Sequence, residues 1–214
     1  MKLKTALFDF DGVILNTEPL YDIFWDEAGI RYNTGIDHFA AAVKGTTLPG
    51  IMDKYFHDYP EEVRQKLINE STEYERTMPL PAMPGAIEFL RSLKEHGVKT
   101  GLVTSSDDTK TRRAFELHHL DTLFNTVVTA NRITKGKPDP MCYLLAARDL
   151  EVEPRDCLVF EDSFAGIEAG TSAGMRVIGV ATTNPAESLK DKVYEVIDGF
   201  MGIGFEDYLR WQEA

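Results

Sequence analysis

Two aspartates separated by one residue follow a short apolar segment near the start of the chain, in Thr5-Ala-Leu-Phe-Asp9-Phe-Asp11-Gly12. In an extended segment, alternate side chains point the same way with Cα atoms roughly 6 to 7 Å apart, so both carboxylates would face one site. Gly12 would then allow a sharp turn and a close approach to a ligand. Taken alone, such a run is about as often a turn or a helix cap as a catalytic pair.

Further polar residues stand at or just beyond the ends of other apolar segments. Thr104 ends one, where its hydroxyl and the N–H groups that follow, beginning at Ser105, could hold phosphate oxygens. Lys137 precedes a helix whose start is set by prolines, a rigid frame that could direct an ammonium inward. Glu161 and Asp162 stand at the end of a third apolar segment. Each has an ordinary structural explanation, as a cap or a solvated charge, but together they supply one chemistry.

That chemistry is phosphoryl transfer. Crowded carboxylates repel one another strongly, and a hard divalent cation relieves the repulsion. Oxygen-only ligands favour Mg²⁺ over zinc. Lys137 and Thr104 could then stabilise the equatorial oxygens of the transition state. Asp9 could form an aspartyl-phosphate, while Asp11 protonates the leaving oxygen and later deprotonates the attacking water.

The elements that must position these residues alternate after residue 80. Strands alternating with helices of about ten residues indicate a parallel sheet covered on both faces, an α/β fold. The expected strands are 98–104, 124–129, 157–160 and 177–181, and the expected helices are 84–96, 107–119, 139–150 and 164–173.

Residues 18–80 break this alternation, with apolar residues at helix-like spacing and no convincing strand. A proline-rich segment, 78–84, closes the stretch and would suit a stiff hinge. We therefore expect an α/β catalytic core of residues 1–16 and 81–214, with a helical cap domain of residues 17–80. Within the cap, we expect Trp25 and Phe56 to pack in the hydrophobic core instead of contacting a ligand.

At these residues the chain resembles the haloacid dehalogenase superfamily. Within it, the chain is similar to the β-phosphoglucomutase-like and phosphatase branch, which implies a Rossmann-like three-layer parallel-sheet core with a small all-helical cap inserted after the first strand. The matching motifs are Asp9-Phe-Asp-Gly-Val-Ile-Leu-Asn-Thr-Glu18, Leu102-Val-Thr-Ser105, Lys135-Gly-Lys-Pro-Asp-Pro140 and Val159-Phe-Glu-Asp-Ser-Phe-Ala-Gly-Ile-Glu-Ala-Gly170.

The resemblance implies a role for each candidate residue. Asp9 would be the nucleophile and Asp11 the acid and base. Thr104 and Lys137 would bind the phosphate, and we expect the adjacent Ser105 to bind it as well. The Mg²⁺ ligands would be Asp9, the Asp11 carbonyl, Asp162 and Glu161, the last either directly or through water.

Departures from the family's hexose-phosphate mutase favour hydrolysis. Leu48 stands where the mutase pattern Lys-Gly-x-x-Arg has its arginine, which grips a second phosphate. Tyr21 replaces a histidine and Asn16 an acid. We expect a Mg²⁺-dependent phosphatase for a small phosphorylated metabolite, with the mutase reaction as the alternative. The cap residues that could line its substrate site are Asn16, Thr17, Glu18, Tyr21, Lys44 and Thr47.

A third class of protein also gathers acids, a threonine and a lysine at the ends of parallel strands. Signalling receiver domains are phosphorylated on aspartate without turnover, but they are shorter and lack both the Asp-x-Asp-Gly turn and the helical insertion. A silent binding module would be marked by the loss of Asp9 or Asp11, and both are present.

The overall composition limits the partners. The formal net charge of −12 over 214 residues argues against a nucleic-acid binder, which needs a basic face. Cys142 and Cys157 lie in apolar stretches and are expected to be buried, free thiols. The chain shows no signal-peptide pattern and no apolar run of membrane-spanning length. We expect a cytoplasmic monomer that binds neither nucleic acid nor membrane.

Overall fold

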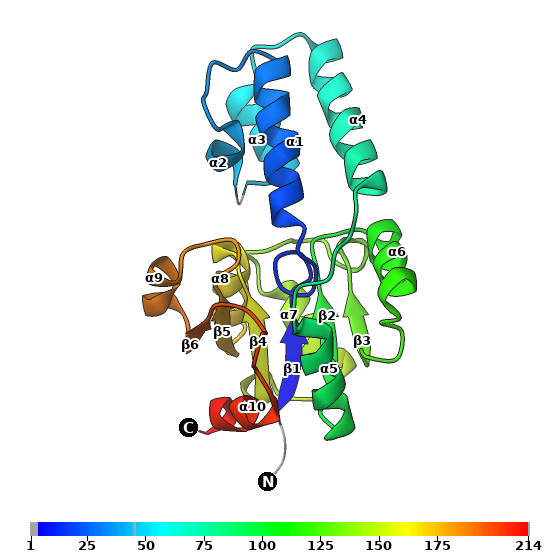
Figure 1. Ribbon diagram of the computed structural model, residues 1–214, viewed down its shortest axis with the longest axis vertical. Helices are drawn as coiled ribbons and strands as arrows, with labels where there is room; N and C mark the ends of the chain where they lie inside the picture. The colour runs from blue at the N-terminus through cyan, green and yellow to red at the C-terminus, as the bar shows by residue number, and fades with distance from the viewer. Residues whose placement is uncertain (1–3, 45, 214) are drawn as a thin grey trace. The chain divides into compact units, whose positions relative to one another are not determined.

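The computed structural model describes residues 4–44 and 46–213. The chain folds as two compact units. The core unit comprises Met1–Asn16 and Leu80–Ala214, and the helical unit comprises Thr17–Pro79. Figure 1 shows the strands of the core unit and the helices of both units.

The core unit is built on a six-stranded sheet with the order β3-β2-β1-β4-β5-β6, in which every neighbouring pair is parallel. The strands are β1 (Thr5–Phe8), β2 (Thr100–Val103), β3 (Thr126–Val128), β4 (Cys157–Glu161), β5 (Arg176–Val180) and β6 (Glu195–Ile197). The chain builds outward from β1 to β3 and then returns to place β4 on the other side of β1. This reversal creates a switch point at the carboxyl ends of β1 and β4, the usual location of a ligand site in such sheets.

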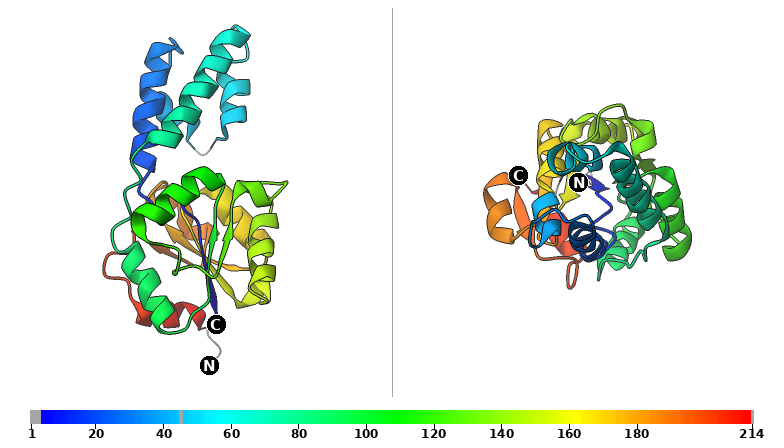
Figure 2. Two further views of the ribbon diagram at one scale, coloured as in Figure 1. Left: turned by 90° about the vertical axis from the view of Figure 1, so that its right-hand side faces the viewer. Right: turned by 90° about the horizontal axis from the view of Figure 1, so that it is seen from above.

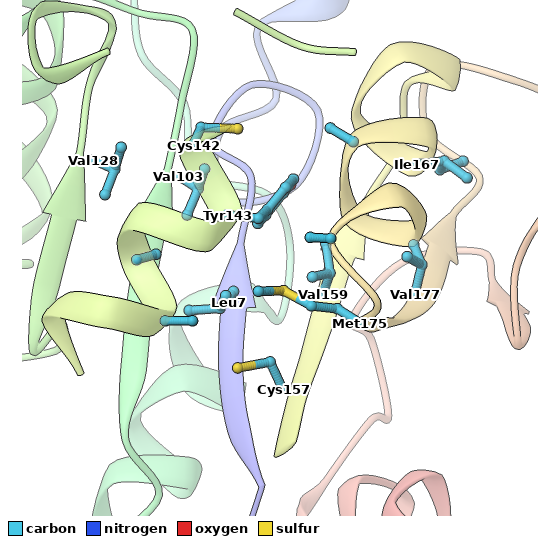
Figure 3. Close-up of a cluster of buried hydrophobic side chains, with 14 of the residues drawn as sticks. Leu7, Val103, Val128, Cys142, Tyr143, Cys157, Val159, Ile167, Met175 and Val177 are labelled. Atoms are coloured by element: carbon cyan, nitrogen blue, oxygen red, sulfur yellow. The ribbon is translucent and has the colours of Figure 1, made fainter. Parts of the chain in front are cut away.

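One face of the sheet is covered by α7 (Met141–Asp149) and α8 (Phe164–Ser172). Leu7 of β1 and Val159 of β4 point to this face and join a cluster with residues of both helices (Figure 3). Cys142 and Cys157 belong to the same cluster and are buried and free, as predicted.

The opposite face is aromatic. Phe8 and Phe160, each one position along from Leu7 and Val159, stack with ring centroids 4.6 Å apart. Phe89 of α5 (Ala86–Glu95) and Trp211 of α10 (Phe205–Gln212) pack edge-on against Phe160. Because side chains alternate along a strand, neighbouring residues of β1 and β4 supply both cores. The predicted three-layer, Rossmann-like α/β fold is confirmed, and Figure 2 shows the core helices around the sheet.

The observed helices and strands of the core unit differ slightly in length from the predicted ones. The predicted strands and helices all occur, but most are a few residues shorter because hydrogen bonding ends before the apolar run does. The sixth strand, β6, was not predicted, because a strand of three residues at a sheet edge carries little sequence pattern. The other elements are α6 (Asp108–His118), α9 (Ala186–Leu189) and three 3₁₀ turns, Ala130–Arg132, Pro154–Asp156 and Lys190–Lys192.

The helical unit has its own core. Trp25 and Phe56 are buried in it, as predicted, together with Phe24, Phe39 and Leu67. The described residues of this unit contain no strand. Its helices are α1 (Glu18–Arg31), α2 (Phe39–Val43), α3 (Leu48–Tyr55) and α4 (Glu61–Thr77).

The two chain segments of the core unit that lead into and out of the insertion are hydrogen-bonded to each other. Leu15 and Ala82 form an antiparallel bridge. The Asn16 N–H donates to the Pro81 carbonyl at 2.8 Å. The crossing points therefore lie side by side. Among the described residues, no helix is long and apolar enough to cross a membrane.

Candidate active site

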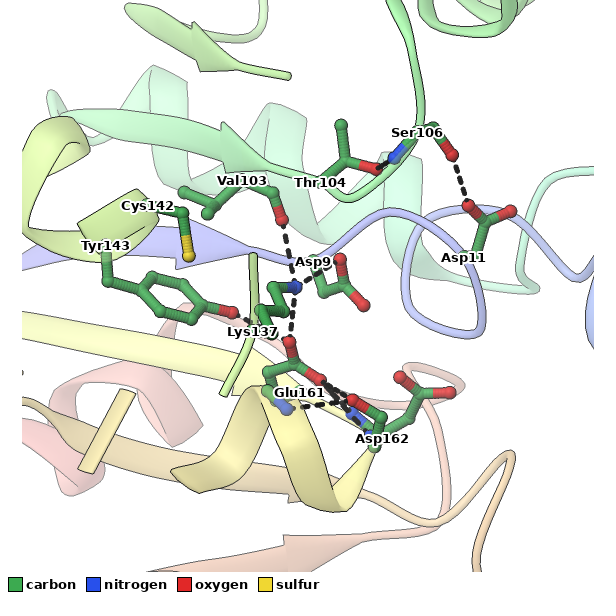
Figure 4. A network of polar contacts seen from close by, with 12 residues as sticks. Asp9, Asp11, Val103, Thr104, Ser106, Lys137, Cys142, Tyr143, Glu161 and Asp162 are labelled. Carbon is green, nitrogen blue, oxygen red and sulfur yellow. Dashed lines mark hydrogen bonds and ion pairs between the residues drawn. The ribbon is translucent and has the colours of Figure 1, made fainter. Parts of the chain in front are cut away.

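Asp9 directly follows β1, and its N–H continues the ladder by donating to the Phe160 carbonyl at 3.0 Å. Its side chain is nearly buried. Lys137, which lies 128 positions further along the chain, places Nζ 2.7 Å from Asp9 Oδ1 and 2.5 Å from Glu161 Oε1 (Figure 4). The same ammonium donates to the Val103 carbonyl at 3.3 Å. The residue after β1, residues of β2 and β4, and a residue of the loop before α7 thus meet at one point.

Glu161 is fully buried and accepts hydrogen bonds at both carboxylate oxygens. The Tyr143 hydroxyl donates to Oε1 at 2.9 Å, beside Lys137. Oε2 accepts from the N–H groups of Asp162 and Ser163 at 3.1 and 3.2 Å, and from the Ser163 hydroxyl at 3.0 Å. Sequence reasoning missed Tyr143, because an aromatic residue on the buried face of a helix normally reads as core.

Asp162 completes the acidic group. Asp9, Glu161 and Asp162 each offer a carboxylate oxygen, and these oxygens lie within 4.8 Å of one another. The Thr183 hydroxyl donates to Asp162 Oδ2, and the Asn184 side chain donates to the Asp162 carbonyl at 2.9 Å. Both residues follow β5 and were not predicted from the sequence, since polar residues after a strand are common in turns.

Two glycines make room for these acids. Gly12 has φ +76°, and a Cβ built on it would lie 1.8 Å from Asp162 Oδ2. The turn conformation is what the sequence predicted for Gly12, but the close approach is to the Asp162 side chain, and the predicted approach to a ligand stays a prediction. A Cβ on Gly166, in the first turn of α8, would lie 1.7 Å from Glu161 Oε1. Neither position can carry a side chain without moving a carboxylate.

The charges around Lys137 do not cancel. Burial lowers the pKa of Lys137, but the adjacent carboxylates of Asp9 and Glu161 raise it further than burial lowers it, so the amine stays protonated. Burial and the Glu161 charge raise the pKa of Asp9 above its usual range, against the opposing effect of Lys137. One ammonium shared between two carboxylates cannot neutralise both, and the site keeps an excess of negative charge.

The residues present fit a hard divalent cation. The donor set contains only oxygen atoms, and these are buried and converge within a small volume. The excess negative charge favours a cation, and carboxylate ligands suit Mg²⁺. Glu161 differs from Asp9 and Asp162 because protein donors already occupy both of its oxygens.

Asp11 lies beside this group but has separate partners. Its Oδ2 accepts from the Ser106 hydroxyl at 2.8 Å, and its Oδ1 lies 2.6 Å from Lys110 Nζ. The Lys110 side chain is only 2% exposed. The sequence identified Asp11 but neither Ser106 nor Lys110 as its partner. A lysine in the first turn of a polar helix is normally a solvated charge.

Thr104 is buried at the end of β2, and its N–H donates to the Val128 carbonyl at 2.9 Å. Its Oγ1 accepts from the Ser106 N–H at 2.9 Å, which shapes the turn after the strand. Ser105 is exposed in the same turn. The assignment of both residues to phosphate binding stays a prediction.

The residues predicted to contact substrate from the cap have partners inside the helical unit. Lys44 pairs with Asp22 at 3.2 Å and Glu18 at 3.8 Å, and the Tyr21 hydroxyl donates to Glu75 at 3.0 Å. These contacts give Lys44, Glu18 and Tyr21 structural roles in the unit. Their contact with substrate stays a prediction.

The other predicted substrate contacts lie at chain turns. Thr47 caps α3, accepting from the Gly50 N–H at 3.4 Å, and Thr17 is buried before α1. Asn16 pairs through its backbone with Pro81, as described above. Nothing in these contacts assigns them to substrate, and that assignment also stays a prediction.

Comparisons with known proteins agree with this arrangement. The chain is 33% identical over 185 residues to hexitol phosphatase A of Escherichia coli, covering 84% of each chain. It is 30% identical over 196 residues to β-phosphoglucomutase of Bacillus subtilis, covering 86% of this chain and 85% of that one.

A solved structure is similar over the whole fold. The crystal structure of a HAD hydrolase, family IA, variant 3, from Entamoeba histolytica superposes with a TM-score of 0.86 at 26% identity, covering 99% of this chain and 100% of that one. The sequence model of the family described as haloacid dehalogenase-like hydrolase matches residues 6–180. These residues run from β1 to the end of β5 and so include every strand that carries a candidate catalytic residue. The chain therefore belongs to the haloacid dehalogenase-like hydrolase family and is an enzyme.

Proposed function

We propose that this enzyme is a Mg²⁺-dependent phosphoric monoester hydrolase in which Asp9 attacks phosphorus. The observation that carries the proposal is the position of Lys137 Nζ, 2.7 Å from Asp9 Oδ1 at the switch point of the sheet. A phosphate bound there would meet a nucleophile and a cation together. The buried surroundings strengthen both interactions, because they exclude competing water.

In the first half of the reaction, an Asp9 carboxylate oxygen forms a bond to phosphorus, and the bond from phosphorus to the leaving oxygen breaks. The electron pair of that bond stays on the leaving oxygen, which takes a proton from the Asp11 carboxyl group. The products are a free alcohol, an aspartyl-phosphate on Asp9 and an ionised Asp11.

In the second half, a water oxygen attacks the same phosphorus while Asp11 takes one of its protons. The bond between phosphorus and the Asp9 oxygen breaks, and its electron pair restores the Asp9 carboxylate. Inorganic phosphate leaves, and both aspartates are returned to their starting states. Thr104, Ser105 and Lys137 hold the phosphate oxygens throughout, and Lys137 stabilises the charge that develops on them.

The cation would be held by Asp9, the Asp11 carbonyl and Asp162, with Glu161 directly or through water. When bound, Mg²⁺ would neutralise the phosphate dianion that the Asp9 carboxylate would otherwise repel. A direct bond to Glu161 would displace at least one of its protein donors, which favours the water-mediated arrangement for this residue.

The proposed substrate is a phosphorylated sugar or sugar alcohol. The similarity to hexitol phosphatase A supports this class. We assign the helical unit, residues 17–80 in the predicted division, to a cap. The residues proposed to contact the substrate are Thr17, Glu18, Tyr21, Lys44 and Thr47 of this cap, and Asn16, the core residue that precedes it. The paired crossing segments at Asn16 and Pro81 would let such a cap close and exclude bulk water.

A sugar-phosphate mutase is the second candidate, because the chain is also similar to β-phosphoglucomutase. It would return the phosphoryl group of Asp9 to a sugar instead of to water. Leu48 offers no charged contact to the second phosphate that this reaction requires. A charged hydrogen bond of that kind contributes about 1.5 to 3 kcal/mol, which favours hydrolysis here.

The test compares wild type with Asp9→Asn for phosphate release from hexose and hexitol monophosphates. The amide cannot attack phosphorus, so the variant should lose activity while circular dichroism and thermal unfolding show an intact fold. Asp121→Asn, which neutralises an exposed carboxyl group in the core unit, is the matched control and should behave as wild type. If Asp9→Asn kept more than a few per cent of wild-type turnover, Asp9 would not be the nucleophile.

A further inference from the structure

We propose that Lys110 is a positioning residue for catalysis: together with Ser106 it holds the Asp11 carboxyl group in the orientation for proton transfer. This inference rests on the proposed function, since it assigns a support to the acid and base of that reaction. It concerns residues that no sequence motif identified.

Each oxygen of the Asp11 carboxyl group has its own donor. Lys110 Nζ lies 2.6 Å from Oδ1, and the Ser106 hydroxyl donates to Oδ2 at 2.8 Å. Two contacts to two different oxygens fix both the position and the rotation of a planar group. The ammonium pairs with the ionised form of Asp11, the form that takes a proton from water, and each oxygen keeps a second lone pair on which the proton for the leaving oxygen can reside. Figure 4 shows Ser106 approaching the Asp11 carboxylate.

The donors are themselves held firmly. The Ser106 N–H donates to Thr104 Oγ1 at 2.9 Å, and the Ser106 carbonyl accepts from the Ala130 N–H at 3.0 Å. The Lys110 N–H donates to the side chain of Asp107, the N-cap of α6, at 2.9 Å. Asp11 is thereby tied to α6 through Lys110 and to the turn that follows β2 through Ser106. Sites held by regular elements keep their geometry better than sites held by loops alone.

The burial of Lys110 needs an explanation. Its side chain is 2% exposed, although it stands in the first turn of a helix whose neighbouring residues Asp108, Thr109 and Arg112 are exposed. Burying an ammonium is costly, and a well-placed partner only offsets that cost. Such a pair contributes little net stability, so a role in positioning Asp11 accounts for it better than a role in folding.

Positioning matters here because proton transfer depends steeply on geometry. A displacement of about 1 Å can cost on the order of 100-fold in rate, and general acid catalysis contributes about 100-fold to 10,000-fold. Without Lys110, the Asp11 carboxyl group would keep only the Ser106 contact of this pair. The loss should fall on steps that need a proton from Asp11, and it should spare a step that needs none.

The leaving group separates these steps. A sugar oxygen needs a proton as it leaves, whereas 4-nitrophenolate is a stable anion and leaves without one. Both substrates still need Asp11 to activate water in the second half of the reaction. The experiment therefore measures the first turnover by rapid quench, with 4-nitrophenyl phosphate and with a hexose monophosphate that the wild type hydrolyses.

The variants are Lys110→Met, Lys110→Arg and Ser106→Ala, with Asp11→Asn as the benchmark. Arg112→Met removes an exposed cation from the same helix and is the matched control. For Lys110→Met we expect a loss of about 10- to 100-fold in the first turnover of the sugar phosphate, with KM unchanged within about twofold. Nitrophenolate release should fall by less than about threefold, followed by slow hydrolysis of the aspartyl-phosphate. Lys110→Arg should recover part of the loss, and Arg112→Met should match wild type.

Equal losses on the two substrates, or no loss on either, would overturn the inference. If Lys110→Met fails to fold, Ser106→Ala decides the question in the same assay. We expect it to show the same difference between the two substrates, with a smaller loss in the first turnover of the sugar phosphate. The parent proposal fails separately. Phosphate release by Asp9→Asn would reject the proposed function itself. Only this inference would be rejected if Asp9→Asn is inactive and Asp11→Asn loses more activity on the sugar phosphate than on 4-nitrophenyl phosphate, but Lys110→Met and Ser106→Ala show no such difference.

Discussion

Oδ2 of Asp162 lies where a side chain on Gly12 would have to begin: a Cβ at position 12 would lie 1.8 Å from it. The turn after Asp11 therefore packs directly against Asp162, a proposed metal ligand. Gly12 contributes to the site by the absence of a side chain, in a backbone conformation with φ +76° that also favours glycine.

Gly12→Ala should therefore lose most of its activity and require more Mg²⁺, because the methyl group displaces the Asp162 carboxylate. Gly97→Ala is the matched control, since Gly97 has a similar φ of +74° but nothing within 4 Å of a built Cβ. Both substitutions carry a strain of about 1 to 2 kcal/mol, which urea unfolding measures. Measuring phosphate release at increasing Mg²⁺ concentrations distinguishes the two variants, because only Gly12→Ala should need more Mg²⁺. Equal activity losses in the two variants would contradict the role given to Gly12.

Removing the metal should abolish turnover reversibly. Asp9, Glu161 and Asp162 form an oxygen-only set with excess negative charge, so a chelator should stop phosphate release and added Mg²⁺ should restore it. Asp162→Asn should need a much higher Mg²⁺ concentration for half-maximal activity. Full activity in thoroughly demetallated protein would reject the metal assignment.

The Tyr143 hydroxyl should stabilise the fold through Glu161. Tyr143→Phe keeps the buried ring but takes one donor from Oε1 of a fully buried carboxylate. We expect a loss of about 1 to 3 kcal/mol in the free energy of unfolding, measured with urea. Tyr194→Phe is the control, because Tyr194 is half exposed and its hydroxyl makes only a 3.4 Å contact. A Tyr143→Phe variant as stable as the control would show that the bond to Glu161 contributes nothing.

The aspartyl-phosphate should pass its phosphoryl group to water. Incubation with β-glucose 1-phosphate and a trace of the corresponding bisphosphate distinguishes the two reactions. With Leu48 in place of a cationic residue, we expect free phosphate and little glucose 6-phosphate. Efficient formation of glucose 6-phosphate with little free phosphate would replace the phosphatase proposal with the mutase.

The sequence alone was enough to predict the α/β core, because the alternation of strand and helix patterns depends on local periodicity. It was also enough to place Asp9, Glu161 and Asp162 near one another. Each stands at the carboxyl end of a predicted parallel strand, and parallel strands bring those ends to one edge of the sheet. Gly12 was interpretable for a similar reason, since its permissive backbone is a property of the residue itself.

The tertiary structure alone decided which strands are neighbours, and therefore which side chains meet. Nothing local in the sequence says that β1 lies between β2 and β4, yet this order brings Lys137 between Asp9 and Glu161. Lys110 and Tyr143 illustrate the same limit. Each lies on a helix whose pattern reports burial or exposure of a face, but a pattern cannot name a partner 99 positions away, as Asp11 is from Lys110. Such pairings depend on how separate elements pack, and packing is a property of the whole fold.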